Sequence, residues 1–379
     1  MEKFGLPSEE MLAEKLDTQN VLLAGIAAAQ GSIVPTSWKD VQNIVRNGLA
    51  PKVFAIGDQF TVTRGSETLT FDVIGFDHDV PADAQFKHSM TLQLHDTLGG
   101  TQYDAPEAIY YAEEELPAGT YNFTIAGYDK WAAGTYQFTT TKAIPAGGQV
   151  VLNGYYAYNG AFTNAKIRTY AKQTDTTPLE TDLVITAGSG GTALQNVNHV
   201  HRISYGSNNW SESAMRQFLN SDKAAGSVWA PQTKYDRPPS WLTSLAGFMN
   251  GLDSEFLKVV GAVTKRTCKN NINEGGGYTD TVDKFFLLSR SEVFMTTEVA
   301  SVDEGAAYDY YKNYSDSASA NTGNDKNRIK YRNNAAQWWW LRTPHTGYAN
   351  HVRIVHTGGQ LYYNDACSSG AVAPACNII

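Results

Sequence analysis

The chain is poor in cysteine and in charge. Its three cysteines, Cys268, Cys367 and Cys376, are an odd number and show no CxxC spacing, which argues against a disulfide framework. Charged residues make up 18% of the 379 residues, the formal net charge is −8, and no basic tract occurs. Proteins that bind phosphate backbones need clustered lysine and arginine, so we expect no nucleic-acid partner.

Long hydrophobic runs are also missing. The longest apolar run near the start, Val21 to Ala29, is far too short to span a bilayer. An acidic segment with helical spacing precedes this run, where a secretory signal would carry basic residues. We therefore expect no membrane span and no signal peptide, and we expect the protein to be made and folded in a cytoplasm.

Common catalytic motifs are absent as well. The sequence has no GxSxG, HExxH or P-loop motif, and no GxGxxG between a strand and a helix. His78-Asp79 and His95-Asp96 are adjacent pairs, and neighbours in a strand point to opposite faces, so neither pair is predicted to be an acid–base dyad. We therefore predict no catalytic residues.

Metal ligation has two weak candidates. Alternation would place His199 and His201 on one strand face, but no third ligand is evident beside them. Asp280 and Asp283 would help to hold a structural Ca²⁺, although the twelve-residue EF-hand pattern is absent. We predict no metal site from residue spacing and no cofactor other than such a structural Ca²⁺.

The composition points instead to a β-rich globular protein with long polar loops. The chain contains 21 tyrosines and 33 glycines, and 12% of its residues are aromatic. Tyrosine together with small polar residues is typical of recognition surfaces. The length is enough for two or three domains.

Residues 1–50 are predicted to be helical. One helix begins after Ser8, and a second begins near Ser37 and ends at Gly48. The second helix presents an apolar stripe of Trp38, Val41, Ile44 and Val45. This segment is either a packing pair of helices or an assembly and attachment segment, and we expect the latter.

The next segments change to strand patterns. Residues 52–98 contain strands at 59–63, 68–74 and 90–94, with a turn at Gly65-Ser66. In residues 105–200 a glycine turn followed by an alternating strand recurs at 116–125, 132–140 and 144–152, which predicts a small β-sandwich. Residues 175–200 have the composition of a linker or long loop.

Residues 205–379 have a mixed pattern. A helix capped by Ser211 places Met215, Phe218 and Leu219 on one face. Residues 285–288 are predicted to form a buried strand. Trp338, Trp339 and Trp340, followed by Arg342 and Pro344, are predicted to be scaffold residues that bury large areas.

The tail at 345–370 alternates a regular frame with assorted residues. The assorted set contains thirteen residues: His345, Tyr348, Asn350, His351, Ile354, His356, Tyr362, Tyr363, Asn364, Asp365, Cys367, Ser368 and Gly370. Each is encoded by a codon that differs from the asparagine codon AAC only at its two adenines. Of the residue types that such codons never encode, only Gln360 occurs in residues 345–379. The tail therefore has the pattern expected of adenine-directed diversification, although a selected β-loop composition would also produce it.

Five elements in order resemble a known type of protein. They are GDQFTVTRGSETLTFDVIGF, SNNWSESAMRQFLN, FFLLSRSEV, WWWLRTP and a glycine-framed tail ending in VAPACNI. This order is similar to the C-type-lectin-like variable proteins of diversity-generating retroelements, whose relatives occur in gut phages and bacteria. The resemblance covers 52–98 and 205–379, and it implies that the thirteen assorted positions bind ligand. Gln360 and Ala371 depart from the pattern.

The resemblance implies an α+β fold. It consists of a C-type-lectin-like (formylglycine-generating-enzyme-like) domain at 52–98 and 205–379, a β-rich, sandwich-like insertion or middle domain at 105–200 and the short helical N-terminus. It implies a receptor-binding protein, such as a phage-tail adhesin, located on a virion or cell surface. The partner would be a host-surface protein or glycan, and the protein would be a homo-oligomer, with a trimer suggested by analogy with phage fibres.

Two alternatives remain open. Formylglycine-generating oxidases share the fold and use a paired-cysteine copper site, for which Cys367 and Cys376 are the close pair in this chain. The other alternative is an invariant structural protein of a virion or surface, whose tail no longer varies. Sequences of the gene from many isolates would separate this second alternative from a diversified binding protein.

Overall fold

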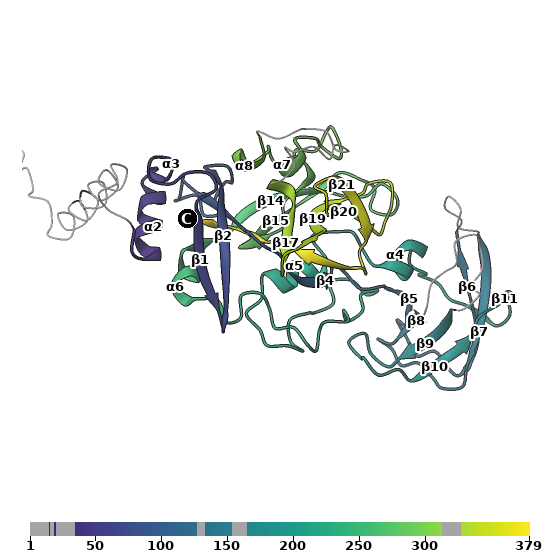
Figure 1. Ribbon diagram of the computed structural model, residues 1–379. Helices are drawn as coiled ribbons and strands as arrows, with labels where there is room; N and C mark the ends of the chain where they lie inside the picture. The colour runs from purple at the N-terminus through teal and green to yellow at the C-terminus, as the bar shows by residue number, and fades with distance from the viewer. Residues whose placement is uncertain (1–14, 16–18, 20–34, 127–132, 154–164, 313–326) are drawn as a thin grey trace, which may run out of the picture.

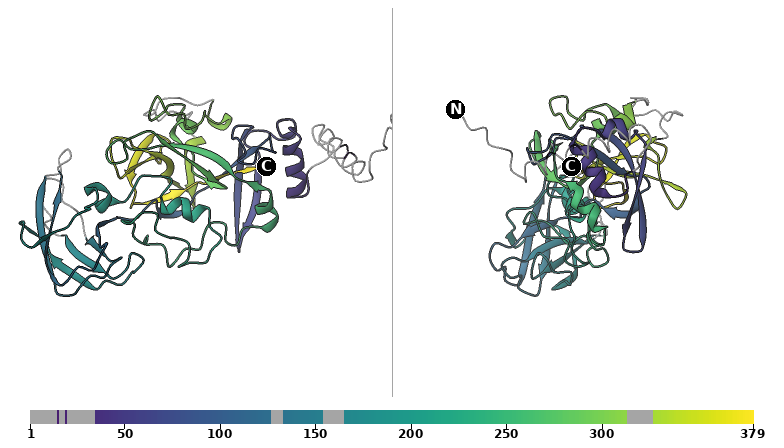
Figure 2. Two further views of the ribbon diagram at one scale, coloured as in Figure 1. Left: turned by 180° about the vertical axis from the view of Figure 1, so that it is seen from behind. Right: turned by 90° about the vertical axis from the view of Figure 1, so that its left-hand side faces the viewer.

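The computed structural model describes residues 15, 19, 35–126, 133–153, 165–312 and 327–379. The helix predicted after Ser8 falls on residues outside these ranges. A central domain carries the helices α2 (Trp38–Arg46) and α3 (Ala50–Val53) at one end, and a β-sandwich lies at its other end (Figures 1 and 2). The central domain and the sandwich have separate hydrophobic cores, so the chain folds as two packed units.

The central domain contains a six-stranded sheet that joins the two halves of the chain. Its strands are β1 (Gln59–Arg64), β2 (Glu67–Phe76), β3 (Met90–Leu94), β13 (Val260–Gly261), β16 (Phe285–Phe286) and β23 (Ala375–Ile378). The C-terminal strand β23 pairs antiparallel with β3 and lies between β3 and β13. The three predicted strands at 59–63, 68–74 and 90–94 are confirmed, and Gly65 has the positive φ of 58° that the turn between the first two requires.

A second, five-stranded sheet carries the C-terminal tail. Its order is β21 (Leu361–Asp365), β20 (His351–Val355), β19 (Trp339–Pro344), β22 (Ser369–Val372) and β4 (Leu98–Gln102). Two ribbons complete the domain: β14 (Val263–Cys268) with β15 (Tyr278–Asp283), and β17 (Lys330–Arg332) with β18 (Ala335–Gln337). The tail therefore forms regular strands whose outermost member within the described residues is β21.

The helices are short and pack around these sheets. They are α2 (Trp38–Arg46), α3 (Ala50–Val53), α4 (Val200–Tyr205), α5 (Ala214–Leu219), α6 (Ser254–Val259), α7 (Arg290–Phe294) and α8 (Asp309–Lys312). Helix α5 buries Met215, Phe218 and Leu219 as predicted, but its cap is Ser213, so the prediction of Ser211 was wrong. Ser213 accepts a hydrogen bond from the backbone N–H of Arg216 at the third helical position, the geometry of an N-cap.

Helix α2 begins at the predicted cap. Ser37 and Asp40 form a reciprocal capping box, and the helix buries Val41, Ile44 and Val45. Val41 and Val45 belong to the core of the central domain, and Gln42 donates a hydrogen bond to the carbonyl of Ile379 at 2.6 Å. The boundary predicted at residue 50 was therefore misplaced, since α2 packs as part of the central domain.

The predicted β-sandwich is confirmed. One sheet contains β5 (Ala108–Tyr111), β8 (Gln149–Asn153), β9 (Lys166–Tyr170) and β10 (Glu180–Val184); the other contains β6 (Gly119–Ile125), β7 (Gly134–Thr140), β11 (Thr186–Ala187) and β12 (Thr192–Ala193). Residues 180–193, expected to be linker or loop, supply three edge strands: β10 to the first sheet, and β11 and β12 to the two edges of the second. These segments form strands because they pair with neighbouring strands through backbone hydrogen bonds. Their side chains are so polar that the sequence pattern did not indicate strands there.

The fold class is thus a β-rich α+β, with short helices around two sheets and a sandwich. Within the described residues, no helix has the length and apolarity needed to cross a bilayer.

Candidate functional site

The thirteen assorted positions of the tail lie along β20, β21, the loops that flank them and the start of β22. Ten of them are partly or fully exposed, and we call these ten the display face. Its members are His345, Tyr348, His351, His356, Tyr362, Tyr363, Asn364, Asp365, Cys367 and Ser368. Tyr362 is the most prominent large side chain among them, with 55% of its surface exposed.

The other three assorted positions are buried, so their prediction as displayed residues was wrong. Asn350 is 2% exposed and donates a hydrogen bond to Asp365 at 2.6 Å. Ile354 belongs to the central core. A Cβ at Gly370 would lie 2.3 Å from the ring of Trp338, so only glycine fits there. Ile354 lies two residues after Val352 in β20, so strand alternation places it on the same buried face.

The frame residues between the assorted positions are mixed in burial. Ala349, Val352, Val355 and Ala366 have no exposed surface, and Gly359 is buried. The other frame residues are partly exposed: Thr346, Gly347, Arg353, Thr357, Gly358 and Leu361. Gly359 adopts a positive φ of 86°, which the turn between β20 and β21 requires. The buried frame residues anchor the strands, and ten of the thirteen assorted residues have exposed surface.

Aromatic rings and imidazoles contact one another across the display face. The His351 ring stacks on Tyr363 at 4.7 Å between centroids, and Tyr348 lies 4.4 Å from His351. His345 meets Tyr348 edge-on at 4.9 Å, and Tyr362 stacks on Tyr363 at 5.0 Å. These contacts restrict side-chain motion before any ligand binds, which lowers the entropy cost of binding.

Glu298, whose side chain is 3% exposed, forms an ion pair with a residue of the strand β20 that carries part of the display face. Arg353 faces Tyr363 across the strand pair and binds Glu298 through two nitrogens, at 2.7 and 2.8 Å. Although burial opposes the charged form, hydrogen bonds from Arg353 and Arg290 hold the pKa of Glu298 below its usual range. Burial and the neighbouring Arg353 lower the pKa of His345 to about 4, so this imidazole is neutral at pH 7.

The scaffold residues before the tail behave as predicted. Trp339 and Trp340 are fully buried, and their indole N–H groups donate to the carbonyls of Arg328 at 2.9 Å and Thr101 at 3.0 Å. Trp338 is partly buried and packs edge-on against Trp340. Pro344, which ends β19, is also buried.

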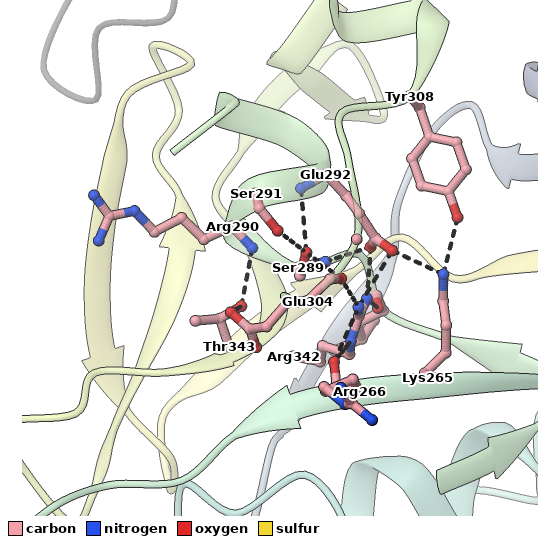
Figure 3. A network of polar contacts seen from close by, with 12 residues as sticks. Lys265, Arg266, Ser289, Arg290, Ser291, Glu292, Glu304, Tyr308, Arg342 and Thr343 are labelled. Carbon is pink, nitrogen blue, oxygen red and sulfur yellow. Dashed lines mark hydrogen bonds and ion pairs between the residues drawn. The ribbon is translucent and has the colours of Figure 1, made fainter. Parts of the chain in front are cut away.

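Arg342 lies in a buried polar network (Figure 3). Its guanidinium contacts both carboxylate oxygens of Glu292, at 2.6 and 3.2 Å, and donates to the carbonyls of Leu287 and Glu304. Glu292 also accepts from Lys265 at 2.8 Å. A capping box with Ser289 orients Glu292 at the start of α7. The network ties β19, α7 and β14 together directly under the tail.

The same network borders a cavity of about 690 Å³. His78, Asp79 and Glu292 lie close enough there to hold a metal ion. However, the Lys265 ammonium contacts both carboxylates, at 2.5 Å from Asp79 and 2.8 Å from Glu292. The ammonium of Lys265 therefore balances the negative charge of Asp79 and Glu292, and the arrangement is an ion-pair network.

His78 and Asp79 are in contact, contrary to the prediction from strand alternation. Their Nδ1 and Oδ1 atoms lie 3.2 Å apart, and His78 Nε2 lies 2.8 Å from the carbonyl oxygen of Ala306. Strand β2 ends at Phe76, and Asp77 has a positive φ of 49°, so alternation no longer applies.

The residues that the sequence offered as candidate metal ligands have other partners in the structure. His199 and His201 were predicted on a strand, but His199 is the N-cap of α4 and accepts from the backbone N–H of His201. Asp280 and Asp283 were considered for Ca²⁺. Asp280 instead pairs with Arg266, and the buried Asp283 pairs with Arg216 at 2.6 Å.

The two cysteines of the copper alternative lie on different elements. Cys367 follows β21, whereas the buried Cys376 belongs to β23 in the other sheet. Burial raises the pKa of Cys367 to about 12 and raises that of Cys376 further. Copper binds thiolates, and both environments favour the protonated thiol.

Comparison with known proteins identifies one family. A family model described as a domain of unknown function (DUF6273) matches residues 175–379, more than half of the chain. The chain belongs to the DUF6273 family. No curated protein and no solved structure matches it. The DUF6273 region includes the last strands of the sandwich, the network around Arg342 and the whole display face.

Sequence reasoning missed the residues that support the display face. Glu298 binds Arg353 and Asn208 binds the carbonyl of Tyr348; both are far from the tail in the sequence, and no local pattern links them to it. The one available signal was the Ser289–Glu292 spacing, which matches a capping box at the end of an apolar run. It locates a helix start without revealing that Glu292 also binds Arg342.

Glu304 gives the domain a pH dependence. Its side chain is buried beside Thr343, and burial raises the pKa of Glu304 to about 7 from the usual 4.5. The folded state therefore holds the proton more tightly than the unfolded chain. The stability that this provides is complete below the unfolded pKa and is lost as the pH rises through 7.

We expect Glu304→Gln to become progressively more stable than the unaltered protein between about pH 5 and about pH 8. The shift corresponds to a gain on the order of 3 kcal/mol in unfolding free energy. Urea unfolding of both proteins across this range measures it. The exposed Glu255, changed to Gln, is the control and should show no such trend. A constant difference between Glu304→Gln and the unaltered protein would contradict the prediction.

Proposed function

We propose that this DUF6273 protein is a binding protein whose C-terminal face is diversified by a retroelement, and that it serves as a receptor-binding adhesin of the phage-tail type. The observation that carries the proposal is the difference in burial within 345–370. Ten of the thirteen assorted positions are partly or fully exposed, against six of the eleven frame positions, and the frame residues Ala349, Val352, Val355 and Ala366 have no exposed surface. A surface built to vary needs this separation, since buried positions tolerate few substitutions.

The chemistry of the display face supports recognition of a protein or glycan on a host surface. Tyrosine rings provide large, stiff contact areas, and the imidazoles and amides provide hydrogen bonds. Arg353 is neutralised by Glu298, and His345 is neutral at pH 7, so the face does not favour acidic ligands. A neutral surface of this kind suits polar, uncharged groups.

The finer points of fold and assembly are part of the same proposal. A C-type-lectin-like domain is supported by the pairing of β23 with β3, which brings the end of the chain to its first sheet. We further propose a homo-oligomer, with a trimer by analogy with phage fibres, located on a virion or cell surface. Repetition of a weak site around an oligomer would raise avidity.

Two display libraries test the proposal. In the first library the ten display-face positions vary together; in the second, the four fully buried frame positions Ala349, Val352, Val355 and Ala366 vary. Most members of the first library should fold, and selection against a purified test protein such as lysozyme should enrich specific binders. The second library should mostly fail to fold. If the first library folds as poorly as the second, or never yields a binder, the display face is not a tolerant binding surface.

A further inference from the structure

One buried amide holds the loop that carries three display-face residues, His345, Tyr348 and His351. Asn208 has no exposed surface. Its Nδ2 lies 2.8 Å from the carbonyl oxygen of Tyr348, 2.9 Å from that of His351 and 3.4 Å from that of His345. Its backbone N–H donates to the carbonyl of Ala349 at 3.2 Å. All four contacts go to the backbone of the loop.

Asn208 is itself oriented by a second amide. Asn270 donates through Nδ2 to the side-chain oxygen of Asn208 at 2.9 Å, so the nitrogen of Asn208 must face the loop. Asn270 also donates to Glu274 at 3.0 Å. The next residue, Asn271, donates its backbone N–H to the carbonyl of Thr346 at 2.9 Å. Two neighbouring segments therefore grip the loop through its main chain.

The polar contacts continue into the β-sandwich. Glu274 lies 3.5 Å from Arg202, and Arg202 lies 3.2 Å from Glu107, which directly precedes β5. Beside them, the carbonyl of Tyr205 accepts from the backbone N–H of Cys367 at 2.9 Å. Arg202 and Tyr205 therefore connect the sandwich to both ends of the display face. Arg202 does so through Glu274 and Asn270 to Asn208, and Tyr205 does so directly at Cys367.

We infer that Asn208 is the positioning residue of the 345–351 loop and that it makes the shape of the loop independent of the side chains displayed there. The inference rests on the proposed function for its biological meaning. The physical reason is that a carbonyl shielded from water and left without a partner costs more free energy than an average hydrogen bond contributes. The carbonyls of His345 and His351 also accept backbone N–H groups within the loop, whereas the carbonyl of Tyr348 accepts from the Asn208 side chain. The loop therefore keeps the conformation in which Asn208 satisfies the carbonyl of Tyr348, whatever residues occupy positions 345, 348 and 351.

Hydrogen exchange of the backbone amides of His345 and Tyr348 tests the inference. Both amides are hydrogen-bonded within the loop, to the carbonyls of His351 and His345. Asn208→Ala should lower their protection by about tenfold or more, while amides of β2 and β3 stay protected. Asn208→Asp should act similarly at neutral pH, since a carboxylate oxygen then faces three carbonyls. At acidic pH, after correction for intrinsic exchange, this variant should regain protection, because a protonated carboxyl donates a hydrogen bond again.

The recovery at acidic pH separates positioning from a general loss of packing, since Asn208→Ala has no group that regains a proton. The exposed Asn47, changed to Asp, is the matched control and should alter neither loop nor core. Joint replacement of His345, Tyr348 and His351 by serine should leave loop protection unchanged. The inference is overturned if that triple variant exposes the loop, if neither Asn208 variant does, or if all amides lose protection together. Exchange needs no ligand, so these outcomes are independent of whether the libraries yield binders.

Discussion

Replacement of Arg342 by alanine is expected to destabilise the protein by about 3–5 kcal/mol. The guanidinium has no exposed surface and contacts both oxygens of Glu292 (Figure 3). Although burial opposes its charged form, Arg342 and Lys265 hold the pKa of Glu292 below its usual range. Without Arg342, Glu292 would keep only one cationic partner, and the carbonyls of Leu287 and Glu304 would lose a donor. Urea unfolding of purified variants measures the loss.

Two further variants identify the cause of this loss. Arg332→Ala removes an arginine that is only partly buried and donates to the carbonyl of Thr97, and we expect a loss of less than about 1 kcal/mol. The double variant Arg342→Met with Glu292→Gln removes both charges and should be more stable than Arg342→Ala. A loss below about 1 kcal/mol for Arg342→Ala would contradict the role of the network.

Replacement of Trp339 by alanine is expected to cost about 3–5 kcal/mol. The indole is fully buried in the central core, and its N–H satisfies the carbonyl of Arg328 at 2.9 Å. Alanine leaves a cavity and an unpaired carbonyl, so two costs add. Thermal and urea unfolding measure the change, with the exposed Tyr362→Ala as a control expected to lose less than about 1 kcal/mol. Equal losses for the two variants would show that Trp339 is not a core anchor.

Local sequence patterns were sufficient for much of the secondary structure. Strands β1 to β3, helix α2 with its cap at Ser37, and the sandwich strands after each glycine turn were all predicted from period and turn chemistry. Those signals are local and depend on the backbone geometry of a few residues. The edge strands in 180–193 were missed because their pairing partners, β6, β7 and β9, supply the missing stabilisation.

The candidate site was predicted in outline. The frame of small and branched residues in the tail indicated which positions pack, and the burial of Ala349, Val352, Val355 and Ala366 agrees with it. Asn350, Ile354 and Gly370 were predicted to be displayed, but they are buried. Asn350 is bonded to Asp365 across the tail, Ile354 packs in the central core, and Gly370 lies against Trp338; each burial depends on how the strands pair and pack, which the order of residues in the tail does not specify.

The alternation of frame and assorted residues, the tryptophan anchors before the tail and the low charge of the tail can all be recognised in the amino-acid sequence. The residues that support the displayed surface became evident from the packing of the folded chain. Asn208 and Glu298 lie at 137 and 55 residues' separation from the tail residues that they bind, His345 and Arg353. The alternation of residues along a strand indicates which face of the strand a side chain occupies. The residues that it contacts on that face depend on how distant segments of the chain pack.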